Sequence, residues 1–168
     1  GYGLMSEACE YDLPYVAEHC DVFYIGGTKV GAMFGEAVVF SGMKAPKYFF
    51  TNVKRHGALL AKGRMLGIQF DTLFSDGLYF KISKHAIDMA AAIRKIFAKH
   101  NIPLAYDSPT NQQFVILSPA LYQALSKLVA FEIWEKKNEQ EIVCRFVTSW
   151  ATKEEELEEL DKALEKIS

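Results

Sequence analysis

Several features that mark common classes of protein are missing from these 168 residues. No apolar run is long enough to span a membrane, and the first residues lack the basic-then-apolar pattern of a signal peptide. The chain has no basic excess, because 19 lysines and arginines stand against 21 aspartates and glutamates. That balance argues against a nucleic-acid-binding module. We therefore expect neither a membrane nor a nucleic acid as a partner.

Cysteine is scarce, and Cys9, Cys20 and Cys144 are odd in number and widely spaced. They fit neither a disulfide framework nor a CxxC metal site, and the four histidines show no ligand spacing. We expect reduced thiols, no metal ion and a cytoplasmic location. Half of the residues are hydrophobic and 13% are aromatic, which is enough to build a sizeable core and excludes wholesale disorder.

One lysine stands in a glycine-bounded turn, Gly26-Gly27-Thr28-Lys29, between strand-like runs at residues 22–25 and 36–40. Two nucleotide motifs are excluded, because a P-loop needs Gly-Lys-Ser/Thr and the dinucleotide fingerprint needs glycine where Thr28 stands. We expect a lysine between two buried strands, where water is scarce. Desolvation disfavours an ammonium and favours a neutral amine that forms Schiff bases. From the residues alone, an exposed turn lysine is the more common alternative.

Arg145 is the second candidate residue, in a strand-like run at residues 142–148. The alternation of this run places Arg145 on one face with two valines. An arginine in such a place needs an anionic partner, and its planar fork suits a substrate carboxylate. The alternative is a partly exposed arginine that pairs with Glu132 or Glu135 on a neighbouring strand, and the residues alone favour it.

Lys54 and Lys62, on either side of Gly57, are the third candidates, and they predict a basic face near the start of a helix. A solvated helix end is an equal alternative. Hydrophobic spacing predicts the other elements. Strands are expected at residues 114–117, 131–136 and 142–148. Helices are expected at residues 14–19, from Ala45-Pro46 onward, over 59–74 as a mostly buried segment, at 78–97 and 119–128, and from a capping box at Thr152.

Residues 26–40, which begin Gly-Gly-Thr-Lys, resemble the cofactor-lysine segment of threonine aldolases. These are pyridoxal-phosphate (PLP) enzymes of the aspartate-aminotransferase fold type, fold type I. Residues 54–63 and 145–148 resemble two further landmarks of the family, in the expected order. The resemblance implies an α/β fold: the C-terminal part of the large PLP-binding domain (residues 1–75), a connecting helix (76–101) and a small α+β C-terminal domain (102–168).

The family resemblance also implies an activity and residue roles. The enzyme would be a lyase that cleaves threonine or allo-threonine into glycine and an aldehyde, as a homodimer or homotetramer. Lys29 would hold PLP as a Schiff base, Thr28 would contact its phosphate or fix the turn, and Arg145 would bind the substrate carboxylate. Lys54 and Lys62 would contact the cofactor phosphate or the substrate.

The chain also departs from the family pattern. Related enzymes often have Gly-Gly-Gly-Met-Arg near residues 57–62, and this chain does not, so the role of that arginine is unfilled or passes to Lys62. The remaining cofactor contacts should lie upstream of Gly1, in the other half of the same polypeptide. Two alternatives stay open. One is another fold-type-I lyase, which acts by β-elimination on aromatic amino acids or on phenylserine, and the other is a non-catalytic fragment.

Overall fold

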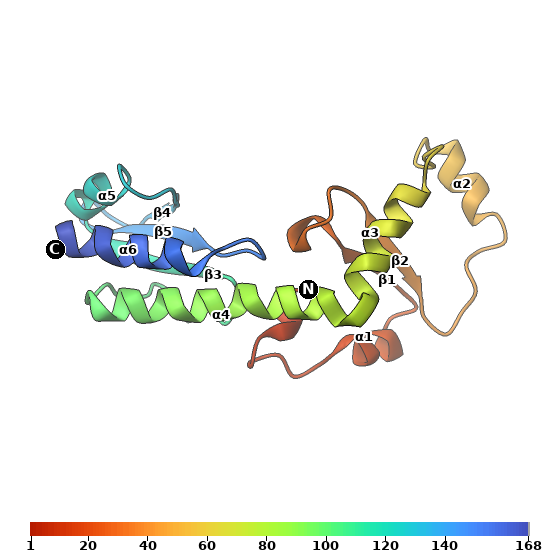
Figure 1. Cartoon of the computed structure of the whole chain (residues 1–168), viewed down its shortest axis with the longest axis horizontal. Coiled ribbons are helices and arrows are strands. Elements are labelled where there is room, and N and C mark those ends of the chain that lie inside the picture. The colour runs from red at the N-terminus through yellow and green to blue at the C-terminus, as the bar shows by residue number, and fades with distance from the viewer. Residues whose placement is uncertain (168) are drawn as a thin grey trace.

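The computed structural model describes residues 1–167 as an elongated molecule built along one long helix (Figure 1). The helices are α1 (Leu13–His19), α2 (Phe49–Arg55), α3 (Arg64–Phe74), α4 (Leu78–Lys99), α5 (Pro119–Leu125) and α6 (Glu154–Ile167). The strands are β1 (Val22–Gly26), β2 (Glu36–Phe40), β3 (Gln112–Leu117), β4 (Glu132–Lys136) and β5 (Ile142–Val147). Short 3-10 turns are η1 (Gly3–Met5), η2 (Thr28–Val30) and η3 (Ser75–Gly77).

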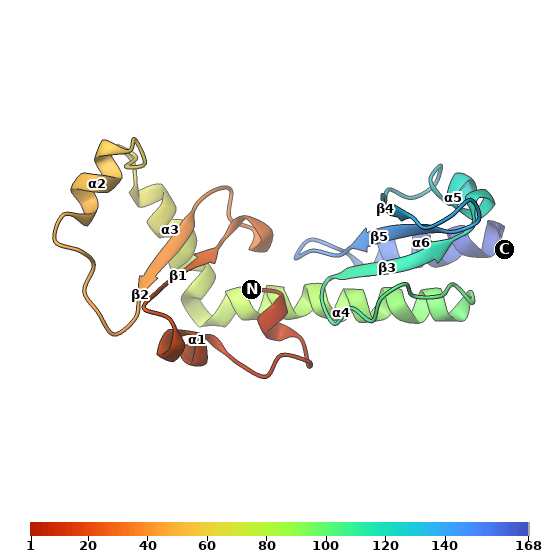
Figure 2. The same ribbon diagram turned by 180° about the vertical axis from the view of Figure 1, so that it is seen from behind.

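Helix α4 connects the two ends of the molecule. Its apolar stripe recurs every three or four residues, and Ala86, Met89, Ile93 and Phe97 are all buried. The helix ends before Asn101, whose left-handed backbone (φ 56°) suits asparagine better than most residues. One end of α4 contacts α3 and η2, and the other contacts β3 and α6 (Figure 2). The helix predicted at residues 78–97 and its stop signal are confirmed.

The larger buried cluster lies between α4, α5, α6 and an antiparallel sheet of order β3-β5-β4. The ring of Phe97 on α4 meets the ring of Phe146 on β5 edge to face, with 4.9 Å between centroids. The predicted strands and final helix are confirmed, but the capping box at Thr152 is wrong. Glu156 instead accepts a hydrogen bond from the backbone N–H of Lys153 at 2.9 Å, because α6 begins later than the pattern suggested.

The other end of the molecule is built on β1 and β2, two strands that were predicted and that pair antiparallel. Two helix predictions here are wrong in part. Pro46 opens a turn, because its carbonyl oxygen accepts a hydrogen bond from the backbone N–H of Phe49, and α2 begins only at Phe49. The segment predicted as mostly buried helix over residues 59–74 is helical only from Arg64, and Leu73 is its one buried residue within the described helix. Hydrophobic spacing alone cannot distinguish a buried face from one that this chain leaves uncovered.

Large apolar side chains are exposed mainly in this β1–β2 end. Six large apolar residues at this end are each more than half exposed to solvent: Tyr24, Met33, Val38, Tyr48, Phe50 and Ile68. Apolar surface on this scale is typical of an interface with another segment or chain. Among the helices of residues 1–167, none combines the length and the apolar character needed to cross a membrane.

Candidate functional site

The turn that carries Lys29 is fixed by glycines. Gly27 is buried, and a Cβ atom there would lie 2.8 Å from the Cβ of Ala32 and 2.9 Å from a ring carbon of Phe70. The carbonyl of Gly27 accepts hydrogen bonds from the backbone N–H groups of Val30 and Ala32, each at 3.0 Å. Gly31 follows with a φ of 95°, which side-chain-bearing residues rarely adopt. The turn therefore has a defined shape, with buried Val30 as its anchor.

Lys29 itself is exposed. The expectation of a lysine buried between two strands is therefore wrong for this chain, because β1 and β2 are themselves largely uncovered. Within residues 1–167, the amino group of Lys29 has no hydrogen bond or ion pair. Its neighbour Thr28 is also exposed.

Two tyrosine hydroxyls hold the backbone of this turn. Tyr79, from α4, donates to the carbonyl oxygen of Gly26 at 3.1 Å. Tyr2 donates to the carbonyl oxygen of Lys29 and accepts from the backbone N–H of Trp150 at 3.0 Å. Burial raises the pKa of both phenols, so both remain protonated donors at neutral pH.

Thr28, Lys29 and Arg145 lie together in the wall of one cavity of about 450 Å³. The other lining residues are Tyr2, Asn111, Gln112, Val147, Thr148, Ser149 and Trp150. The cavity therefore joins the η2 turn to the ends of β3 and β5. Sequence patterns had singled out the lysine and the arginine separately, and the fold brings them to the same place.

Arg145 is held by side chains from both neighbouring strands. Its Nη1 donates to Oε1 of Gln112 on β3 at 3.0 Å, and its Nη2 pairs with Glu132 on β4. The guanidinium carbon lies 5.3 Å from the ring centroid of Trp134. The pairing with Glu132, which the residues alone favoured, is therefore present. Glu132 is not part of the cavity wall, so it holds the guanidinium from outside the cavity.

The segment after β5 is fixed to α4 and to the start of β3. Thr148 is buried, and its hydroxyl donates to the carbonyl oxygen of Ala86 at 2.6 Å. The side-chain amide of Asn111 donates to the carbonyl oxygen of Thr148 at 2.7 Å. The cavity wall near Arg145 is thus hydrogen-bonded both to α4 and to the segment before β3. No sequence pattern identified Tyr2, Asn111 or Trp150, since each enters the site through contacts distant in sequence.

Lys54 and Lys62 are not brought into this cavity. Lys54 is exposed in the last turn of α2, and Lys62 is exposed just before α3. Figure 1 places α2 at the opposite end of the molecule from the β3-β5-β4 sheet that carries Arg145. A cofactor-binding role for these two lysines stays a prediction that this chain's own contacts do not test.

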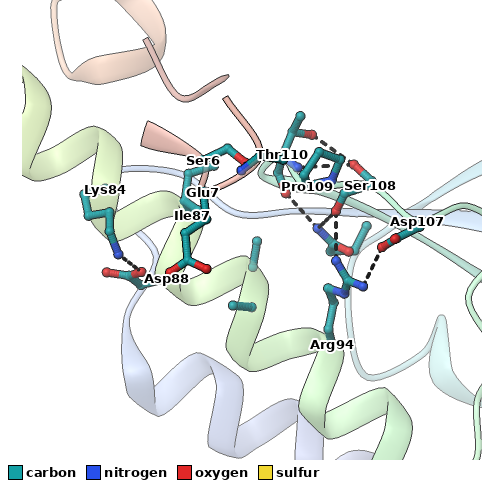
Figure 3. A pocket seen from close by; sticks show the side chains of 14 residues that line it. Ser6, Glu7, Lys84, Ile87, Asp88, Arg94, Asp107, Ser108, Pro109 and Thr110 are labelled. Atoms are coloured by element: carbon teal, nitrogen blue, oxygen red, sulfur yellow. Dashed lines mark hydrogen bonds and ion pairs between the residues drawn. The ribbon is translucent and has the colours of Figure 1, made fainter. Parts of the chain in front are cut away.

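A second cavity of about 380 Å³ lies between α4, the N-terminal segment and the loop at residues 107–110 (Figure 3). Four of its charged residues are paired with one another: Lys84 with Asp88, and Arg94 with Asp107 at 2.7 Å. It contains none of the predicted site residues. Across the described part of the chain, no group of three or more His, Cys, Asp or Glu residues gathers to hold a metal ion.

The chain was compared with known proteins by structure and by sequence. No protein-family model matches the chain. A solved structure of threonine aldolase from Leishmania major superimposes over 97% of this chain with a TM-score of 0.90 and 35% identity. The predicted class, an α/β fold of PLP fold type I, is therefore confirmed for the part that the chain spans.

Two curated relatives give the same family by sequence. Low specificity L-threonine aldolases from Pseudomonas sp. (strain NCIMB 10558) and Pseudomonas aeruginosa are 30% and 28% identical over 142 and 141 residues, 83% of this chain in each case. The resemblance to threonine aldolases is thus confirmed. The chain spans 40% of the length of each curated relative and 48% of the Leishmania chain.

Proposed function

We propose that this chain supplies the lysine and the arginine of a PLP-dependent aldehyde-lyase, which cleaves threonine or allo-threonine into glycine and an aldehyde. One observation carries the proposal: Lys29 and Arg145 come from different parts of the fold and line the same cavity. A nucleophilic amine beside a carboxylate-binding guanidinium is suited to an amino-acid substrate. The names of the relatives, threonine aldolases, supply the choice of reaction.

The residues present fit PLP. The cavity volume of about 450 Å³ lies within the range of small-molecule sites, roughly 300–1,000 Å³. The amino group of Lys29 is uncommitted within residues 1–167, and the glycines of the turn let a ring approach the backbone closely. Thr28 offers a hydroxyl beside the lysine. Further cofactor contacts would come from the part of the relatives that this chain does not span.

In the proposed mechanism, Lys29 would hold the cofactor covalently through Nζ. When bound, PLP supplies an electron-withdrawing ring that stabilises the negative charge left on Cα when the Cα–Cβ bond breaks. Arg145 binds the substrate carboxylate from the cavity side, where Gln112 Oε1 now accepts from Nη1. Glu132 remains paired with Nη2 of Arg145 outside the cavity, so the guanidinium is already oriented when the substrate binds.

The exposed apolar residues of the β1–β2 end support the proposed partners. We infer that this surface packs against the upstream half of the same polypeptide, and that the complete protein is a homodimer or homotetramer. The domain limits proposed are residues 1–75, 76–101 and 102–168. A cytoplasmic location stays a prediction that rests on the free thiols of Cys9, Cys20 and Cys144.

The test uses the complete polypeptide produced with PLP. Borohydride reduction followed by peptide mass spectrometry should find the reduced cofactor adduct on Lys29. The adduct should be absent from Lys29→Ala and retained in Lys44→Ala, a matched change at an exposed loop lysine. Threonine should yield glycine and acetaldehyde, whereas release of pyruvate-type keto acids and ammonia would favour the β-eliminating alternative. If wild type carries no adduct on Lys29, the proposed function fails.

A further inference from the structure

We propose that Tyr2 is a positioning residue, whose hydroxyl sets the spacing between Lys29 and Arg145. This proposal rests on the proposed function of those two residues. The Tyr2 hydroxyl bonds the backbone of the lysine turn on one side and the backbone of Trp150 on the other. Trp150 follows closely after β5, the strand that carries Arg145. One phenol thus connects the two segments that the reaction needs at a fixed separation.

The connection is specific because its two ends belong to different parts of the fold. Lys29 is carried by the turn between β1 and β2, and Arg145 belongs to the β3-β5-β4 sheet. These two sheets are separate, and they share no strand pairing. The segments nevertheless meet, since a Cβ atom on Gly31 would lie 3.6 Å from the indole ring of Trp150. The Tyr2 hydroxyl lies at this junction and lines the same cavity.

The hydroxyl, and not the ring alone, makes the connection. A phenol O–H can donate one hydrogen bond and accept another at the same oxygen, which a phenylalanine ring cannot do. Tyr79 offers a useful contrast, because its hydroxyl bonds only the carbonyl of Gly26. Tyr79 therefore anchors the turn to α4, whereas Tyr2 links the turn by hydrogen bonds to the segment beyond Arg145.

The first experiment needs no cofactor. Amide hydrogen exchange of the chain is compared between wild type, Tyr2→Phe and Tyr122→Phe, after circular dichroism confirms that each variant folds. Tyr122 is the matched control, since its hydroxyl makes no hydrogen bond within residues 1–167. Loss of one hydrogen bond predicts about two- to tenfold faster exchange at the Trp150 amide in Tyr2→Phe alone. Unchanged exchange at Trp150 would overturn the proposal.

The second experiment uses the complete PLP-loaded enzyme. In Tyr2→Phe the adduct on Lys29 should still form, because the lysine itself is intact. Misplacement of lysine against arginine should lower kcat by roughly tenfold to a hundredfold, with a smaller rise in KM for threonine. If Tyr2→Phe exchanges faster at Trp150 but keeps the wild-type kcat and KM, the contact is structural only and the positioning role is overturned.

The two proposals fail differently. Absence of the Lys29 adduct in wild type removes the proposed function and with it the catalytic meaning of Tyr2, while the exchange data still establish whether the connection exists. An adduct in wild type, together with unchanged exchange and kinetics in Tyr2→Phe, leaves the proposed function standing and removes the role of Tyr2.

Discussion

Replacing Arg145 by lysine separates two roles that the structure gives this residue. The guanidinium bonds Gln112 in the cavity and pairs with Glu132 outside it, so it can serve substrate binding, stability or both. Lysine keeps the charge but loses the planar fork, and it cannot bond both neighbours in this geometry. Losing one charge-assisted hydrogen bond to a substrate carboxylate costs about 1.5–3 kcal/mol, which corresponds to roughly a tenfold to hundredfold weaker affinity.

The structural cost of the same change is smaller. The side chain of Arg145 is 25% exposed and that of Glu132 is 69% exposed, so their pairing contributes only about 0.2–1 kcal/mol. The contact with Trp134 adds a comparable amount, about 0.5–1 kcal/mol. We therefore expect Arg145→Lys to lower the free energy of unfolding by about 1 kcal/mol, while the KM for threonine rises at least about tenfold.

Glu132→Gln is the control, since it removes the ion pair and leaves the arginine in the cavity. It should lower stability by no more than about 1 kcal/mol and should not raise KM. Urea denaturation and steady-state kinetics of the complete enzyme measure the two quantities. If Arg145→Lys leaves KM unchanged and matches Glu132→Gln in stability, Arg145 is only the partner of Glu132, and the carboxylate-binding role is refuted.

Three further predictions concern the fold. Phe97→Ala empties the centre of the larger core and should lower the free energy of unfolding by about 3–5 kcal/mol in urea denaturation; a loss below 1 kcal/mol would contradict the packing. Hydrogen bonds from Lys99 and His100 lower the pKa of Asp161, so its stabilising effect is present above the ordinary aspartate range and is lost as the pH falls through the lowered value. Asp161→Asn should therefore flatten the acid limb of stability against pH, and an unchanged limb would reject the argument. Burial raises the pKa of Cys144 to about 11, so at pH 8 iodoacetamide should label the two less buried cysteines first, as peptide mass spectrometry would reveal.

The elements with regular periodicity were predictable from sequence. The apolar stripe of α4 and the alternating residues of β5 each have one repeat, and each packs one face against the main core. The predictions failed where tertiary contacts decide. Pro46 opens a turn and not a helix. The residue before α6 is Lys153 and not Thr152, and Glu156 accepts a hydrogen bond from the backbone N–H of Lys153. Sequence periodicity also predicted burial over residues 59–74, although this chain by itself leaves most of that surface exposed.

The site was predictable only in part for the same reason. Lys29 has a local signature, because glycines shape its turn and the position of Thr28 beside it excludes two nucleotide motifs. Arg145 has a weaker one, since a strand arginine beside acidic neighbours is common, and the pairing with Glu132 does occur. Hydrophobic and glycine patterns give no sign that the two residues converge, and that expectation came only from the family resemblance. In the structure the convergence depends on Trp150 meeting the turn across the molecule.

The meeting of the Lys29 turn with the segment after Arg145 explains why Tyr2, which belongs to no sequence motif, is proposed to affect the reaction. Both segments are anchored to α4, one through Tyr79 and the other through Thr148. Among the described contacts, the Tyr2 hydroxyl is the hydrogen-bonding side chain that joins the two segments directly. In the proposed function, the lysine and the arginine supply the chemistry. A change at Tyr2 alters the distance between them and leaves both intact, so its effect on kcat measures how much of the catalysis depends on spacing alone.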